Sequence, residues 1–228
     1  MRAAYAGRRD PRQESIVDAK KDRAPVSYAV PVANSVGSKG MPRPERERLI
    51  LDAAVAEFGT QGYAHASVAS IARRAEISKP LVYGYFESKD GLYLACLHRG
   101  AAPLVDAVTA AQTGTGLARA LDTLDAIFHT LEPRRLDWAV LWDPTLPPGS
   151  AVAEAARAYR RKLSLLGAEG TKEALSAAGS GDPLDASLLA RIWYGTVNAT
   201  VGWWLEHPGE TAEATTRRCA RILTSLRA

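Results

Sequence analysis

The sequence predicts an all-α fold, and three observations support this prediction. No stretch of the 228 residues alternates polar and apolar side chains as a half-buried strand would. Apolar residues instead recur at spacings of three and four, and Gly and Pro clusters interrupt this helical pattern. The composition, 46% hydrophobic and 24% charged, is that of an ordinary globular protein. We therefore expect packed helices in one or two domains.

Several functional classes are excluded by composition. No apolar run approaches the roughly 20 residues of a membrane-spanning helix, and the N-terminus lacks the apolar core of a signal peptide, so we expect a cytoplasmic protein. Cys96 and Cys219 stand too far apart for a CxxC motif, and we expect both to be small buried hydrophobes. The four histidines are scattered, and no GxSxG motif is present. We expect no metal, no cofactor and no enzymatic activity.

Residues 1–42 differ from the rest of the chain in charge and pattern. They contain eight Lys and Arg against four Asp and Glu, and no helical periodicity. We expect a flexible basic N-terminal tail. It is either an upstream extension, with Met41 as an alternative start, or an arm that contacts DNA phosphate.

Four short helices are predicted between residues 43 and 100. The first follows Pro44, and Gly62 ends it in a left-handed cap. The second begins after the N-cap Ser67 and ends near residue 76, the third covers SKPLVYGYF at 78–86, and the fourth occupies 88–100. Two short helices joined by a turn of three or four residues form the helix-turn-helix shape.

The remaining chain is expected to be helical throughout. Pro133 and several stretches rich in Gly and Pro divide it into segments. The expected helices lie near 102–112, 116–131, 134–142, 150–166, 169–178, 184–206 and 210–227.

The stretch 46–97 resembles the DNA-binding domain of the TetR family of transcriptional regulators. Four pieces carry the resemblance, in the family's order: ILDAAxxxF at 50–58, GY at 62–63, SVxxIA at 67–72 and SKxxVYxYFxSKxxL at 78–92. The resemblance implies a helix-turn-helix DNA-binding domain at 43–100 and a helical effector-binding and dimerisation domain at 101–228. It also implies a bacterial homodimeric repressor that a small molecule releases from a palindromic operator.

The resemblance places nine residues at the DNA. Ser67 and Ser78 stand at helix N-termini, where free N–H groups favour phosphate. Positions that meet base edges are occupied by Lys79, Pro80, Leu81 and Tyr83, and positions that meet the DNA backbone by Gly84, Tyr85 and Lys89. The alternative for the two tyrosines is packing of the third helix against the first.

Two residues depart from the family pattern. Glu76 stands where the turn between the second and third helices usually has Gly, and a left-handed non-Gly residue costs about 1 kcal/mol. Gly84 lacks the side chain with which many members contact phosphate. Both departures weaken the expected DNA affinity and leave the predicted fold unchanged.

Large side chains concentrated between residues 128 and 159 form the candidate effector site. Effector cavities in this family are mostly apolar, which suits an apolar or aromatic molecule. Trp138 and Trp142 share a helix face, although a purely structural role is equally open for them. The complete candidate set is Phe128, His129, Trp138, Trp142 and Tyr159.

The expected helix at 184–206 is apolar nearly all round, which predicts burial on two sides. Gly195, Ala199 and Gly202 form a line of small residues that would let another helix approach closely. Together with the helix at 210–227, this predicts a two-fold, four-helix dimer face. Its other candidate residues are Trp193, Val197, Trp203 and Trp204.

Two other functions remain open. A helical small-molecule-binding protein or enzyme on the same fold would bind a ligand and show no sequence preference on DNA. A non-specific DNA binder that used the basic tail would show steep salt dependence and no preferred site.

Overall fold

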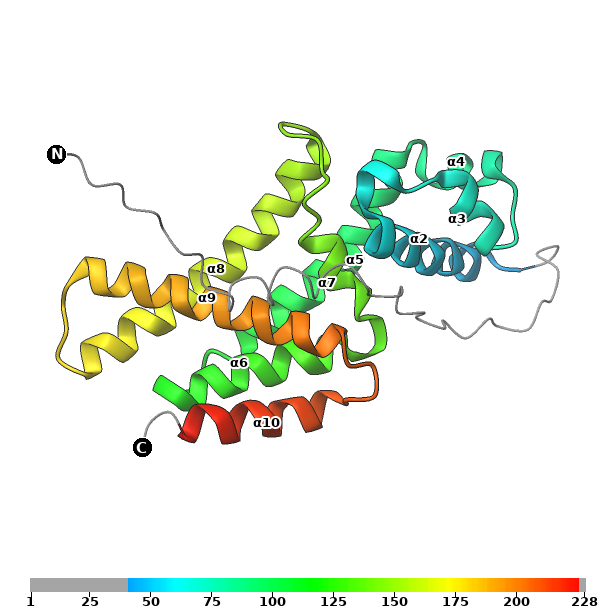
Figure 1. Ribbon diagram of the computed structural model, residues 1–228. Helices are drawn as coiled ribbons and strands as arrows, with labels where there is room; N and C mark the ends of the chain where they lie inside the picture. Colours follow the sequence, from blue (N-terminus) through cyan, green and yellow to red (C-terminus); the bar gives the residue numbers. More distant parts are fainter. Residues whose placement is uncertain (1–40, 226–228) are drawn as a thin grey trace, which may run out of the picture. The chain divides into compact units, whose positions relative to one another are not determined.

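The computed structural model describes residues 41–225, so all but two residues of the expected tail at 1–42 lie outside it. The described part is helical and contains no strand, which confirms the all-α prediction (Figure 1). None of its helices is long and apolar enough to cross a membrane. In chain order the elements are α2 (Arg43–His65), α3 (Val68–Arg74), α4 (Lys79–Phe86), α5 (Lys89–Ala110), α6 (Gly116–Leu131), the 3₁₀ turn η1 (Glu132–Arg134), α7 (Leu136–Leu141), α8 (Ala151–Ala177), α9 (Pro183–Leu205) and α10 (Ala212–Ser225).

The helices α2, α3 and α4 form as the local pattern predicts. The Ser67 hydroxyl accepts a hydrogen bond from the Ser70 amide at the start of α3, and Ser88 caps α5 in the same way. Gly62 kinks α2 at a φ of 73°, one turn before the end of that helix. The inner faces of these helices are fully buried, with Ile50, Ala54, Phe58, Ile71, Val82 and Phe86 in one core.

Two predicted helix breaks are absent. The helix α5 runs through Pro103, and α8 runs through Gly167, so the separate helices expected at 102–112 and at 169–178 do not exist. Pro103 is exposed and cannot donate the backbone hydrogen bond of a helix interior. Leu104 and Val108 are buried, and their burial stabilises the part of α5 that follows this proline. Conversely, α7 is shorter than expected because Pro133 lies in the separate turn η1.

The helix α5 is the central element of this fold, since it contacts α2, α4, α6, α7 and α8. Figure 1 shows α8 and α9 side by side, and α6 beside α10. The short helix α7 packs against both α2 and α5. The helix-turn-helix elements are therefore joined to the rest of the fold through α5 and α7.

Candidate functional site: recognition helix, clamp and cavities

The turn between α3 and α4 has the strained backbone that the sequence predicts. Glu76 adopts a φ of 55°, in the left-handed region that favours glycine. The Ile77 amide donates a hydrogen bond to the Ala72 carbonyl, which closes the end of α3. This turn fixes the direction in which α4 leaves α3.

The helix α4 has one buried and one exposed face. Val82 and Phe86 are buried in the core. Lys79, Pro80 and Gly84 are exposed, Leu81 is half-buried, and Tyr83 is 37% exposed. The Lys79 ammonium lies 5.8 Å from the centre of the Tyr83 ring. The residues predicted to meet base edges thus share one accessible face.

The remaining predicted DNA residues differ in their availability. Ser67 and Ser78 are exposed, and the Ser78 side chain makes no capping hydrogen bond. Tyr85 is half-buried and packs towards α2, where its hydroxyl accepts a hydrogen bond from Arg46 at 3.4 Å. The Lys89 ammonium lies 4.5 Å from the centre of the Tyr63 ring, and burial lowers its pKa. Lys89 and Tyr85 therefore already have contacts within the protein.

A polar clamp joins the C-terminal end of α2 to the loop after α7. The buried carboxylate of Asp143 accepts a hydrogen bond from the Tyr63 amide at 2.6 Å, and the Thr145 hydroxyl accepts one from the Ala64 amide at 3.0 Å. Thr145 also donates its own hydroxyl proton to Asp143. Gly62 permits this approach, because a Cβ there would lie 2.7 Å from the Thr145 hydroxyl oxygen.

Sequence reasoning did not identify this clamp, because its two sides are 80 residues apart. It continues towards α5, since the Tyr63 hydroxyl donates a hydrogen bond to Asp90. Burial, followed by this contact with Asp90, raises the pKa of Tyr63 to about 12. The tyrosine is therefore a neutral donor at physiological pH.

A second polar cluster connects α2, α5 and α7. Arg99 pairs with Asp52 at 2.7 Å, and Arg134 pairs with Asp137 at 2.8 Å. Asp137 is nearly fully buried, and one of its carboxylate oxygens has no hydrogen-bond partner. Burial raises the pKa of Asp137 because the Arg134 ion pair compensates only part of the lost hydration.

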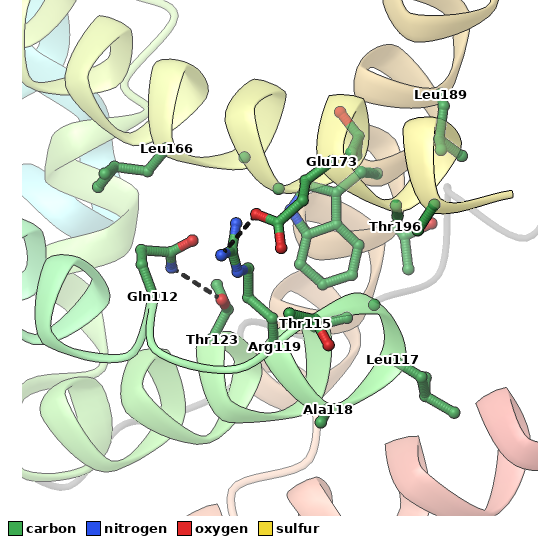
Figure 2. Close-up of a pocket in the computed structure, with 18 of the residues that line it drawn as sticks. Gln112, Thr115, Leu117, Ala118, Arg119, Thr123, Leu166, Glu173, Leu189 and Thr196 are labelled. Carbon is green, nitrogen blue, oxygen red and sulfur yellow. Dashed lines mark hydrogen bonds and ion pairs between the residues drawn. The ribbon is translucent and has the colours of Figure 1, made fainter. Parts of the chain in front are cut away.

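Two cavities lie among the C-terminal helices. The first, of about 980 Å³, is lined mainly by residues of α6, α8 and α9, opens to the surface, and is called here the Arg119 cavity. Figure 2 shows Arg119 and Glu173 facing each other within it, joined by an ion pair of 2.8 Å. The second, of about 500 Å³, is lined by Trp138 and Trp142 and is called the Trp142 cavity.

Of the five predicted effector residues, only Trp138 and Trp142 line either cavity. The other three predicted residues line neither cavity. Phe128 is fully buried against Trp204, with ring centres 5.2 Å apart. His129 is exposed and pairs with Asp125, and the Tyr159 hydroxyl is hydrogen-bonded to His98 on α5. Closeness in sequence did not place these side chains on one surface because they project from different faces of their helices.

The predicted dimer residues fall into a buried group and an exposed group. Trp204 has no exposed surface, and the Arg135 guanidinium lies 4.0 Å from its ring centre, so it is a core residue and not an interface anchor. Val197 is about nine-tenths buried, and Trp193 lines both cavities.

Three of the predicted dimer residues are exposed along α9, and Gly202 is half-buried. The exposed residues continue a stripe of exposed apolar side chains at helical spacing that starts near the beginning of α9. The stripe, named here the α9 apolar stripe, comprises Leu184, Leu188, Ile192, Gly195, Ala199 and Trp203.

Comparison with known proteins finds similar sequences among bacterial transcriptional regulators. The family model "Bacterial regulatory proteins, tetR family" matches residues 50–96. The HTH-type transcriptional activator FasR of Mycolicibacterium smegmatis is 39% identical over 94 residues, which cover 40% of this chain and 43% of FasR. The regulator YuxN of Bacillus subtilis is 43% identical over 54 residues, 24% of this chain and 19% of YuxN. The chain thus spans less than half the length of these curated relatives.

Solved structures match a larger share of the chain. A TetR-like transcriptional regulator from Rhodococcus sp. RHA1 is 27% identical with a TM-score of 0.62, and the match covers 78% of this chain and 92% of that one. The regulator FadR of Bacillus subtilis, solved in complex with stearoyl-CoA, shares the fold at 16% identity and a TM-score of 0.56, over 75% of this chain and 95% of FadR. Residues 50–96 thus match the model of the tetR family of bacterial regulatory proteins, and the helical architecture of the chain is similar to that of TetR-like regulators.

Proposed function

We propose that this protein is a homodimeric, ligand-responsive transcriptional regulator of the repressor type that acts in the cytoplasm. Residues 43–100 form its DNA-binding domain, and residues 101–228 its effector-binding and dimerisation domain. The observation that carries this proposal is the exposed face of α4, which presents Lys79, Pro80 and Tyr83 next to each other on a short helix. The family assignment supports it.

On this proposal α4 enters the major groove of DNA. Lys79 is the partner for guanine, Pro80 and Leu81 contact thymine methyl groups, and Tyr83 adds a further contact. Ser67 and Ser78 contact phosphate at the helix N-termini. Gly84, Tyr85 and Lys89 come close to the DNA backbone. Tyr85 now contacts Arg46 and Lys89 contacts Tyr63, so each side chain either keeps this contact or gives it up for a contact with phosphate.

The α9 apolar stripe is the proposed dimer face. Its side chains are exposed in the single subunit, and a two-fold partner would bury them against the same stripe. Gly195 and Ala199 let the two α9 helices approach closely, and α10 completes a four-helix arrangement. The dimer would hold its two recognition helices in successive major grooves, about 34–36 Å apart, on a palindromic site.

The Trp142 cavity is the proposed effector site. Its walls are mostly apolar, as small-molecule sites usually are, and its volume of about 500 Å³ lies in the usual range. The FadR structure, which contains stearoyl-CoA, supports a large apolar ligand for this fold.

The clamp at Asp143 is the proposed connection between effector and DNA. Trp138 and Trp142 belong to α7 and its C-cap, and Asp143 follows directly, bonded to the end of α2. A ligand that moves Trp142 would shift this carboxylate and with it the helix-turn-helix. Because the coupling is reciprocal, DNA must weaken effector binding by the same factor.

The decisive experiment is selection of binding sites from random duplex DNA by the purified full chain at moderate salt. Recovery of a palindrome with half-sites about 10 base pairs apart is expected. Binding without a consensus that disappears when residues 1–40 are deleted would overturn the proposal in favour of non-specific binding by the tail. No binding at all, from protein that still binds a ligand, would favour the small-molecule-binding alternative.

A further inference from the structure

Two arginines of α2 converge on one tyrosine of α4. The Arg43 guanidinium lies 5.2 Å from the centre of the Tyr85 ring, and Arg46 donates a hydrogen bond of 3.4 Å to the Tyr85 hydroxyl. Arg46 also donates a hydrogen bond to the Met41 carbonyl at 3.1 Å. Tyr85 therefore holds two positive charges from the first turn of α2 beside the C-terminal half of α4.

The two arginines differ in how far the chain already engages them. Arg46 is half-buried and hydrogen-bonded on two sides. Arg43 is exposed, and its side chain makes no ion pair or hydrogen bond within residues 41–225. Its position over the Tyr85 ring restricts where the guanidinium lies and leaves its N–H donors available to an anion.

The surface of α4 next to this pair is open. A Cβ at Gly84 would meet no atom within 4 Å. With about 3.6 residues per turn, Gly84 lies between Pro80 and Tyr85 around the axis of α4. Because glycine has no side chain, nothing projects from this position between the accessible face of α4 and the Arg43–Tyr85 pair.

This place is important for a helix that lies in the major groove of DNA. The groove is about 12 Å wide, and a helix with its side chains is about 10–12 Å across. The two phosphate chains therefore run along both sides of the helix, and groups that flank it on neighbouring helices face phosphate and not bases. A guanidinium in such a position can bind one phosphate through two parallel N–H groups.

We propose that Arg43, which lies over the Tyr85 ring, binds a phosphate of the DNA beside the C-terminal half of α4. The contact fixes the position of α4 in the groove and reads no base. In this way α2 supplies a phosphate contact at the place where α4 itself has no side chain. The inference rests on the proposed DNA-binding function and adds to it a residue outside the helix-turn-helix.

The salt dependence of DNA binding tests this contact. Fluorescence anisotropy of the full chain, with the duplex recovered by site selection, gives the affinity over a range of NaCl concentrations. Arg43→Gln removes the charge and should weaken binding by a factor of about 10 or more. The slope of log affinity against log salt concentration should become shallower by about two, one phosphate for each subunit of the dimer.

Two further variants separate charge from structure. Arg43→Lys keeps the charge and should keep the slope. The matched control is Arg48→Gln, which removes the same charge from the exposed surface of the same helix. Arg48 follows Arg43 by five positions and projects from another side of α2, so its loss should leave the slope unchanged. An unchanged slope in Arg43→Gln, or an equal change in either of the other variants, would overturn the proposal.

A comparison of DNA sequences separates a phosphate contact from a base contact. Arg43→Gln should weaken binding to the selected site and to its single base-pair variants by the same factor, because every sequence carries the same phosphates. Lys79→Ala should instead change the preference among these sites. A changed base preference in Arg43→Gln would overturn the assignment of Arg43 to phosphate.

The open position at Gly84 provides a rescue experiment. Gly84→Lys places a positive charge next to the Arg43–Tyr85 pair in space free of other atoms. In the Arg43→Gln background it should restore most of the lost affinity and slope, and in the wild type it should add little, since both side chains serve one phosphate. Equal gains in the two backgrounds would mean that Arg43 does not bind this phosphate.

The outcomes distinguish this inference from the proposed function. If the wild type selects a palindrome and Arg43→Gln binds it with an unchanged slope, this inference alone fails. If the wild type binds no DNA, the proposed function and this inference both fail.

Discussion

The helix-turn-helix and the C-terminal helices of this chain are packed differently. In α2–α4 the apolar side chains fill their own core, with Ile50 and Ile71 completely buried. In α8 and α9 large apolar side chains such as Leu165 and Leu188 stay exposed, and two cavities remain between the helices. The first region is complete within one subunit. The second leaves apolar side chains exposed and space between its helices.

The largest expected effect comes from shortening one leucine to alanine in each of the two regions. Leu92→Ala removes a fully buried side chain from the core beneath the recognition helix and should cost about 3 kcal/mol. Leu166→Ala, in the wall of the Arg119 cavity, should cost about 1 kcal/mol, because this side chain is only partly buried. Urea unfolding measures both. Equal losses would show that the two regions are equally well packed.

Next in size is the loss of DNA affinity when the exposed face of α4 is shortened. Tyr83→Ala should weaken binding to the selected site roughly 10- to 100-fold, equivalent to about 1–3 kcal/mol, and leave the dimer mass unchanged. Electrophoretic mobility shift and mass photometry measure the two quantities. Tyr85→Ala is the contrast, since this side chain packs against α2 and its loss should lower the melting temperature. Undiminished DNA binding by Tyr83→Ala would contradict the assignment of the recognition helix.

The clamp connects the two regions, and breaking it should separate their behaviour. Both carboxylate oxygens of Asp143 accept hydrogen bonds, one from the Tyr63 N–H and the other from Thr145. In Asp143→Asn a side-chain NH₂ group replaces one of these acceptors and faces a donor, so we expect a loss of about 1–2 kcal/mol in stability. The factor by which effector lowers DNA affinity should also fall towards one. Fluorescence anisotropy with and without effector measures this factor. Asp125→Asn, on the exposed surface of α6, is the control and should keep both properties. Full coupling in Asp143→Asn would exclude the clamp as the connection.

A smaller effect is expected in the turn before α4. Glu76→Gly should stabilise the protein by up to about 1 kcal/mol, because glycine adopts the left-handed conformation without steric cost. The gain is reduced by the greater freedom of glycine in the unfolded chain. Thermal unfolding measures it. A destabilised variant would mean that the Glu76 side chain makes a favourable contribution.

The smallest effect concerns Asp137, whose raised pKa gives stability a defined dependence on pH. Below its ordinary pKa the carboxyl is neutral in both folded and unfolded protein. As the pH rises through the higher pKa of the folded state, the buried group must ionise, and stability is lost. Asp137→Asn avoids this cost. Its melting temperature relative to the wild type should therefore increase as the pH rises above about 4, the ordinary pKa of an aspartate, and a constant difference would contradict the raised pKa.

The local pattern was sufficient to predict the recognition helix. Ser67, Ser78 and Ser88 stand directly before α3, α4 and α5, and the expected left-handed residue at Glu76 is present. The same local rules failed at Pro103 and Gly167, where burial of neighbouring residues outweighs the helix-breaking tendency. They also failed to separate Trp142, which lines a cavity, from Phe128 and Trp204, which are core.

The sequence by itself determined the all-α class, the helix-turn-helix and the resemblance of residues 46–97 to the TetR family, because helix caps and apolar spacings depend on residues within a few positions of each other. Only the tertiary structure decided which aromatic residues line cavities and which apolar residues on α9 stay exposed. It alone brought Asp143 to Tyr63 and placed Arg161 beside the same cavity as Arg191. Such contacts join residues 30 to 80 positions apart, and they follow from how helices pack and not from any local pattern.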